Sequence, residues 1–278
     1  MNLHRSKIEW CTHTWNPVTG CLHGCTYCYA RRFIDRFKPQ PYEYPQPDAL
    51  EFLPHGSGIF VSNSPCNAVN DIQNRMRTTL YPRGFAPTFH TYTLCYPAKR
   101  SIPSRVFVSS LGDLFGEWVP DIWIQDVFDA CEQAPQHTYL FLTKNPQRYC
   151  DLAEAGKLPA RDNFWYGSTV TNDDKPIFFS DKHNCYVSIE PLLGPFDVEV
   201  ASVLENIRWV IIGAMTGPGC KQHQPKREWI ENIVESAELS HAAVFMKDSL
   251  APIWGPDLIR EHPEGMVWPE DNRRRKED

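Results

Sequence analysis

The chain has 278 residues, of which 42% are hydrophobic and 22% charged, a composition typical of a globular protein rather than a disordered one. Its formal net charge of −6 disfavours a protein that coats nucleic acid through a broad basic face, although it is compatible with a local basic groove. No apolar run approaches the ~18–20 residues of a membrane span, and the N-terminal sequence lacks the apolar stretch of a signal peptide. We therefore expect a protein of the reducing cytoplasm with no membrane partner.

The first strand of the sheet is expected over residues 7–12, and a loop with three closely spaced cysteines follows it. These are Cys21, Cys25 and Cys28, in the sequence CLHGCTYC. Disulfides are rare in the cytoplasm, and three thiolates on one loop can hold three irons of a cubane cluster while the fourth iron stays open. A structural zinc site would need a fourth ligand, for which His23 and His13 are the alternatives.

Residues 34–105 differ from the rest of the chain by their proline content and their turn signals. Ten of the 24 prolines lie between Pro39 and Pro103. A structureless loop of this length is unusual in a compact domain, so we expect an ordered insertion with a strand over residues 89–95. We interpret the insertion as a cap and favour the rim of the fold that carries the cysteines, because a partial barrel has an open side.

Apolar runs recur at regular intervals after the insertion. They are rich in β-branched and aromatic residues and are continuous rather than alternating, which is typical of parallel strands buried on both faces. The predicted strands cover residues 105–110, 138–143, 164–170, 185–189, 208–213 and 243–247. Amphipathic helices are predicted between them over residues 121–134, 145–155 and 226–239, whereas residues 171–184 carry a poor helical pattern.

This alternation of strands and helices predicts a parallel sheet with right-handed crossovers. With the first strand it makes six or seven βα units, fewer than the eight of a complete barrel. We predict one α/β domain over residues 1–278, a partial (β/α)6-type parallel barrel with the proline-rich insertion after its first βα unit. An open, doubly wound sheet is the alternative.

The spacing Cys21-x3-Cys25-x2-Cys28, with Tyr27 before the last cysteine, resembles the signature of the radical S-adenosylmethionine (SAM) superfamily. The wider chain resembles a phage-encoded and bacterial family within that superfamily. The matching segments are IEW at 8–10, TWNPVTGC at 14–21, GCTYCYA at 24–30, SSLGDLF at 109–115, PQHTYLFLTKNP at 135–146, SIEPLLGP at 188–195 and WVIIGAMTGPG at 209–219. They cover most of the chain outside the insertion.

This resemblance implies a [4Fe-4S] cluster on Cys21, Cys25 and Cys28, with SAM on the fourth iron. It implies an enzyme that reductively cleaves SAM to a 5′-deoxyadenosyl radical, which abstracts hydrogen from a substrate, and a reductant such as flavodoxin or ferredoxin as partner. Active sites of such barrels lie at the C-terminal ends of the strands. The residues there that are expected to bind SAM are Tyr27, Gly112, Asp113, Ser168, Thr169, Glu190 and Gly213.

Neither the residues nor the resemblance identifies the substrate or a catalytic residue. A nucleobase or nucleotide is the first expectation, because the resembling family is carried by phages that alter their own DNA, while a peptide or a small metabolite stays open. Lys144 and Lys247 also follow strands and could neutralise an anionic substrate group, although a solvated lysine is the simpler interpretation of each. The alternatives to an enzyme are a non-catalytic metal-binding module and an electron-transfer protein on the same fold.

Overall fold

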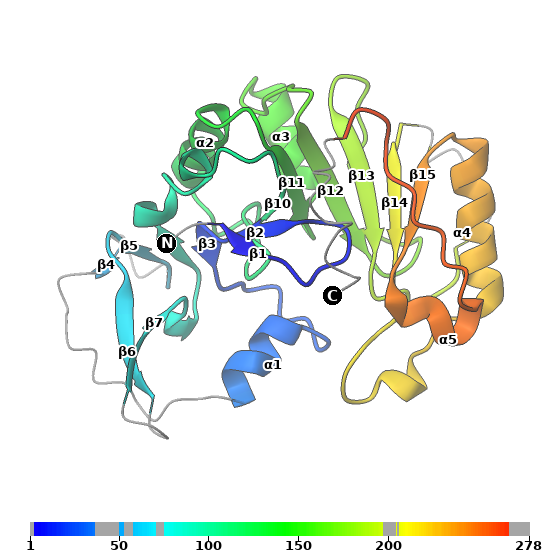
Figure 1. The fold of residues 1–278 in the computed structure, drawn as a ribbon, viewed down its shortest axis with the longest axis horizontal. Helices are drawn as coiled ribbons and strands as arrows, with labels where there is room; N and C mark the ends of the chain where they lie inside the picture. Colours follow the sequence, from blue (N-terminus) through cyan, green and yellow to red (C-terminus); the bar gives the residue numbers. More distant parts are fainter. Residues whose placement is uncertain are drawn as a thin grey trace.

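The centre of the fold is an eight-stranded sheet with the order β1-β2-β10-β11-β12-β13-β14-β15 (Figure 1). The strands are β1 (His4–Arg5), β2 (His13–Trp15), β10 (Arg105–Val108), β11 (Thr138–Thr143), β12 (Phe164–Val170), β13 (Asn184–Ile189), β14 (Trp209–Ile212) and β15 (Ala243–Met246). Strand β1 is antiparallel to β2, and all other neighbours in this sheet are parallel. The computed structural model describes residues 3–36, 50–52, 58–70, 75–196, 204 and 206–266.

The parallel strands follow one another in chain order without a reversal, which confirms the predicted partial parallel barrel. A doubly wound sheet would instead reverse its strand order at a switch point. The six strands predicted after the insertion are each found within two residues of their predicted ends. The prediction of a first strand over residues 7–12 is wrong, because Trp10 and Cys11 turn into the barrel interior and the strand begins at His13.

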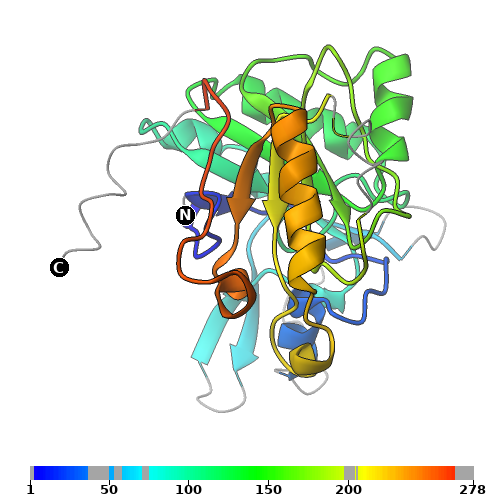
Figure 2. The same ribbon diagram turned by 90° about the vertical axis from the view of Figure 1, so that its right-hand side faces the viewer.

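The helices α2 (Asp121–Glu132), α3 (Gln147–Glu154) and α4 (Arg227–Leu239) confirm the three predicted helices, and they cover the outer face of the sheet (Figures 1 and 2). Strand side chains alternate between two cores. Tyr139 and Phe141 point outward into the larger core under the helices, whereas Leu140 points into the barrel interior. This alternation fixes which side of each strand faces the interior at its C-terminal end.

The insertion is ordered where the structure describes it, and it builds a second sheet on the segment that carries the cysteines. Its order is β3-β9-β5-β4, so β3 (Val18–Thr19), which lies between β2 and the cysteine loop, pairs with a strand of the insertion. The other strands of this sheet are β4 (Leu50–Phe52), β5 (Phe60–Ser62) and β9 (Thr88–His90). Outside this sheet, the insertion also contains β8 (Pro82–Phe85) and the hairpin of β6 (Cys66–Asn70) with β7 (Arg75–Thr79). The strand predicted over 89–95 is too long, because residues 91–93 form a 3-10 helix.

The C-terminal segment bridges the side of the barrel between β15 and β2. After the short helix α5 (Ala251–Trp254), the chain returns antiparallel beside β15, with Met246 N–H donating to Ile259 O at 2.8 Å (Figure 2). Arg260 then donates to Glu9 Oε2 at 2.7 Å. This segment, and not the insertion, links the last strand to the N-terminal part of the chain. Among the described residues, no helix combines the length and apolarity that a bilayer span requires.

Candidate functional site

The three cysteines lie on the loop between β3 and the helix α1 (Tyr29–Arg36), at the end of the sheet where the parallel strands finish (Figure 1). The loop is held at both ends: Cys21 N–H donates to Phe85 O of the insertion at 3.1 Å, and Cys28 N–H donates to Cys25 O at 3.2 Å. The N–H of Arg31 donates to Cys28 Sγ at 3.4 Å. All three side chains are partly exposed.

Two glycines allow three backbone segments to pack directly against one another at this loop. Gly20 has a φ of +79°, and a Cβ there would lie 2.4 Å from Ala86 O of the insertion. A Cβ on Gly112, in the turn after β10, would lie 2.9 Å from Gly20 O, and Gly20 N–H donates to Leu111 O at 3.0 Å. The cysteine loop, the insertion and the Gly112 turn therefore form one unit, in which Gly112 fits because it has no side chain.

Asp113 joins the cysteine loop to the next strand of the barrel. Its side chain is buried, with the residue 4% exposed, and Oδ2 accepts from His23 Nε2 at 2.7 Å, Thr143 Oγ1 at 3.0 Å and Lys144 N–H at 3.0 Å. Oδ1 accepts from Phe115 N–H at 3.0 Å. A buried carboxylate requires such partners, and here they come from the cysteine loop and from the C-terminal end of β11.

Lys144 and Tyr27 lie together beside the cysteines. The Lys144 ammonium is 5.2 Å from the centroid of the Tyr27 ring. Burial lowers the pKa of Lys144, while the charges of Cys25 and Asp113 act in the opposite direction. Burial also raises the pKa of the Cys21 thiol to about 12.

Ser168 and Thr169, at the C-terminal end of β12, point to opposite faces of the sheet. Ser168 shares the outer face with Phe164 and Tyr166, and its Oγ accepts from Phe178 N–H at 2.8 Å. Thr169 is on the same face as Trp165, whose side chain lies in the barrel interior. Of the two hydroxyl groups predicted to bind a cofactor, the structure therefore directs only that of Thr169 toward the barrel interior.

Glu190, Gly213 and Lys247 form a second cluster, at the ends of β13, β14 and β15. Lys247 Nζ donates to Glu190 Oε1 in an ion pair. A Cβ on Gly213 would lie 3.0 Å from Lys247 Cδ and 3.2 Å from the Glu190 side chain, so the absence of a side chain at Gly213 leaves room for this pair. Glu190 is on the interior face of β13, in line with Tyr186.

The cysteine cluster and the Glu190 cluster share one end of the sheet, where α1 begins at Tyr29, directly after Cys28. The Tyr29 hydroxyl donates to Ser110 O at 2.5 Å. The sequence predicted no role for Tyr29 or for the neighbouring Ser109. Ser109 is 3% exposed, has a φ of 58°, and its hydroxyl has no hydrogen-bond partner among the described residues. Tyrosine and serine are too common for sequence alone to have pointed to them.

Comparison with known proteins gives a family and a fold. A family model described as "Protein of unknown function (DUF5131)" matches residues 5–258. The chain belongs to this family. No curated protein matches it.

Among solved structures, this DUF5131 member resembles a spore photoproduct lyase complexed with a dinucleoside spore photoproduct, with a TM-score of 0.50 and 10% identity. The likeness covers 88% of this chain and 78% of that chain. A double mutant of that lyase, with bound AdoMet and the dinucleoside spore photoproduct, matches with a TM-score of 0.49 and 10% identity. At such identities the likeness establishes the fold alone.

The donor set of this DUF5131 member fits an iron–sulfur cluster better than a single ion. Within the described ranges, no three His, Cys, Asp or Glu side chains converge closely enough to hold one metal ion. Thiolates on a cubane each bind a different iron and so do not need to converge on one point. His23 and His13, the alternative zinc ligands, are hydrogen-bonded to Asp113 and to Thr12, respectively.

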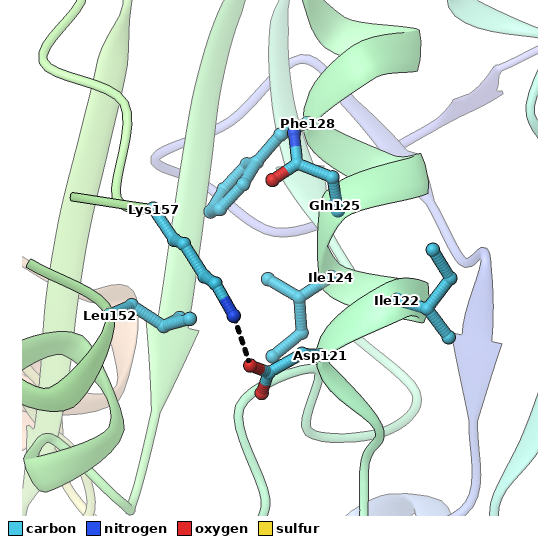
Figure 3. Close-up of a pocket in the computed structure, with 7 residues that line it drawn as sticks. All are labelled: Asp121, Ile122, Ile124, Gln125, Phe128, Leu152 and Lys157. Atoms are coloured by element: carbon cyan, nitrogen blue, oxygen red, sulfur yellow. Dashed lines mark hydrogen bonds and ion pairs between the residues drawn. The ribbon is translucent and has the colours of Figure 1, made fainter. Parts of the chain in front are cut away.

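An apolar groove on the outer surface lies apart from these residues (Figure 3). It lies between α2 and α3, and an ion pair of Lys157 Nζ with Asp121 Oδ2, at 3.0 Å, borders it. The residues lining it are Asp121, Ile122, Ile124, Gln125, Phe128, Leu152 and Lys157, and none of them is a predicted site residue.

Proposed function

We propose that this chain is an iron–sulfur enzyme that reductively cleaves SAM to a 5′-deoxyadenosyl radical for hydrogen abstraction from a substrate. The observation that carries this proposal is the three-cysteine loop at the C-terminal end of a partial parallel barrel, tied to the neighbouring strand through Asp113. The fold likeness to spore photoproduct lyase, one structure of which holds AdoMet, supports the same reaction type.

In this proposal Cys21, Cys25 and Cys28 hold a [4Fe-4S] cluster. When bound, the cluster supplies the electron that cleaves SAM to methionine and the radical. The chain's own contribution is positioning: the Arg31 N–H group stabilises the charge on Cys28 Sγ, and Asp113 keeps the loop against β11. Hydrogen bonds to the ligands of a metal orient these ligands and adjust the properties of the metal.

We assign the SAM site to groups that border the barrel interior next to this loop. Tyr27, Gly112 and Asp113 form its edge on the cysteine side, and Gly213 with Glu190 forms the opposite edge. Thr169 and Ser168 lie between them on β12, where Thr169 offers a hydroxyl on the interior face and Ser168 supports the neighbouring turn through Phe178. The insertion packs on the cysteine loop and would help to keep water from the radical.

For the substrate we propose a nucleobase or nucleotide, with a low-potential flavodoxin or ferredoxin as reductant. The chain has a net charge of −6, but two observations support a substrate that carries phosphate. The lyase that shares the fold is described with a dinucleoside photoproduct. Arg31 and Arg32 on α1 add positive charge next to the cysteine loop, where a phosphate group would be attracted.

The test is anaerobic reconstitution followed by reduction with dithionite in the presence of SAM. We expect about four irons and four sulfides per chain, and slow formation of 5′-deoxyadenosine and methionine without any substrate. Replacing Cys21, Cys25 or Cys28 by Ala should abolish both the iron–sulfur content and the formation of 5′-deoxyadenosine. Cys150→Ala, at a partly buried cysteine outside the loop, should change neither quantity. Stoichiometric zinc without sulfide would contradict the cluster, and a cluster that never cleaves SAM would favour an electron-transfer protein.

A further inference from the structure

Lys144 is fixed at its backbone next to the three cysteines. It is the first residue after β11, and its N–H donates to Asp113 Oδ2 at 3.0 Å. Its ammonium faces the Tyr27 ring at 5.2 Å from the centroid, a distance at which a cation is attracted to the ring face. Tyr27 stands between Cys25 and Cys28 in the sequence, so the ammonium lies over the part of the loop that carries these two cysteines. Lys144 therefore presents a positive charge to the cysteine loop.

This charge has no carboxylate partner within 4 Å in the part of the chain that the structure describes. The nearest acid, Asp113, accepts from His23, Thr143 and two backbone N–H groups, and it binds the Lys144 backbone rather than its ammonium. By contrast, Lys247 at the other edge of the site is paired with Glu190. A partly buried ammonium without a counter-ion is unfavourable unless the site holds further negative charge.

The two arginines at the start of α1 are oriented differently. The Arg31 guanidinium donates to Cys21 O at 3.2 Å and stacks on the Phe85 ring, 4.6 Å from its centroid. The Arg32 guanidinium donates to Thr26 O at 3.1 Å. Both charges therefore compensate backbone carbonyls of the loop, whereas the Lys144 ammonium faces the Tyr27 ring beside the cysteines.

We propose that Lys144 sets the reduction potential of the cluster that the three cysteines hold. The proposal rests on the proposed function, and it assigns Lys144 a positioning role through charge rather than contact with a substrate. One electron passes from the external reductant to the oxidised cluster, and no proton needs to move with it. A fixed positive charge nearby stabilises the more negative, reduced state, so Lys144 makes this reduction easier.

The experiment compares Lys144→Arg, Lys144→Met and Lys144→Glu with the reconstituted wild-type chain, in redox titrations followed by electron paramagnetic resonance without SAM. The Arg variant keeps the positive charge and should keep the wild-type reduction potential of the cluster. Met lowers the ratio of reduced to oxidised cluster at a fixed potential about tenfold, equal to ~59 mV for one electron, and Glu lowers it further. Lys157→Met removes an equal charge beside the outer groove and leaves the potential unchanged (Figure 3).

Wild-type reduction potentials in both the Met and the Glu variant would overturn the proposal. A potential in the Arg variant that shifts as far as in the Met variant would also overturn it, because the effect would then be steric. If the Met variant binds no iron, Lys144→Gln is compared with Lys144→Arg by the same criterion. Failure of the proposed function has a separate signature, since the wild-type protein would then hold no cluster, or would hold a cluster that never cleaves SAM.

Discussion

At the scale of single residues, Asp113 shows how one buried carboxylate organises this site. Its oxygens connect His23 of the cysteine loop, Thr143 at the end of β11 and two backbone N–H groups. The sequence marked Asp113 because it follows a strand and a glycine. Its partners lie 90 and 30 residues away along the chain. The register of β10 with β11 brings Thr143 to it, and the contact of Gly20 with Leu111 brings the loop of His23.

Removal of this carboxylate should therefore loosen the cysteine loop. For Asp113→Ala we expect a loss of about 2–3 kcal/mol in the free energy of unfolding of the apoprotein, because several buried donors lose their acceptor together. Urea denaturation measures this loss. Asp257→Ala removes an exposed carboxylate, and its effect should stay within about 0.5 kcal/mol. Equal stability of both variants would show that Asp113 does not hold the loop.

At the scale of elements, the strands were easier to predict than the contacts between them. The strands after the insertion are continuous apolar runs, which is a local signal that survives without any knowledge of the fold. The same signal led to the wrong strand over 7–12. Trp10 and Cys11 are apolar there because they fill the barrel interior, but they do so from a turn and not from a strand. The spacing of the cysteines was equally local. The role proposed for Lys144 could not be predicted from a local pattern, because it depends on Tyr27 from a distant loop.

The packing of the insertion on the cysteine loop can be tested with two glycines of similar backbone. Gly20 and Gly24 have φ values of +79° and +69°, but a Cβ on Gly20 would lie 2.4 Å from Ala86 O, and one on Gly24 would meet nothing within 4 Å. Gly24→Ala should cost about 1 kcal/mol of unfolding free energy from backbone strain alone. Gly20→Ala should cost clearly more and should lower the iron content after reconstitution.

Comparable losses in the two alanine variants, measured by urea denaturation, would mean that the backbone contact between the loop and the insertion is unimportant. Iron analysis provides a second criterion. The Gly24 variant should keep its iron, because its loop can stay in place, while displacement of Gly20 moves Cys21 directly.

At the scale of the whole molecule, one buried and two half-buried histidines in separate parts of the fold make stability depend on pH. Burial is the main cause that lowers the pKa of His13 on β2, His90 on β9 and His262 near the C-terminus, each to about 4. The ordinary pKa of about 6.5 applies in the unfolded chain, which therefore binds more protons between these two values. Their contribution to stability is complete above pH 6.5 and is lost as the pH falls toward 4.

We therefore expect the urea midpoint of the apoprotein to fall steadily from pH 7 to pH 4.5. His90 is almost completely buried in the insertion sheet, with Nε2 2.9 Å from Thr19 Oγ1, so His90→Gln should make this fall shallower. Replacement of the exposed His241 by Gln serves as the control and should leave the slope unchanged. A midpoint that does not depend on pH in the wild-type chain would contradict the expected effect of burial.

The bridge between the two ends of the chain has a consequence for synthesis on the ribosome. Thr12 beside β2 bonds to Arg105, 93 residues later, and Glu9 bonds to Arg260, 251 residues later. At about 5–20 residues per second, the cysteines leave the ribosome roughly 5–20 s before their neighbouring strand exists. During that interval the insertion is being made, but the thiols do not yet have Asp113 to hold their loop. Iron delivery is therefore best matched to a chain in which Asp113 has already been made, and the contact of Glu9 with Arg260 forms later still.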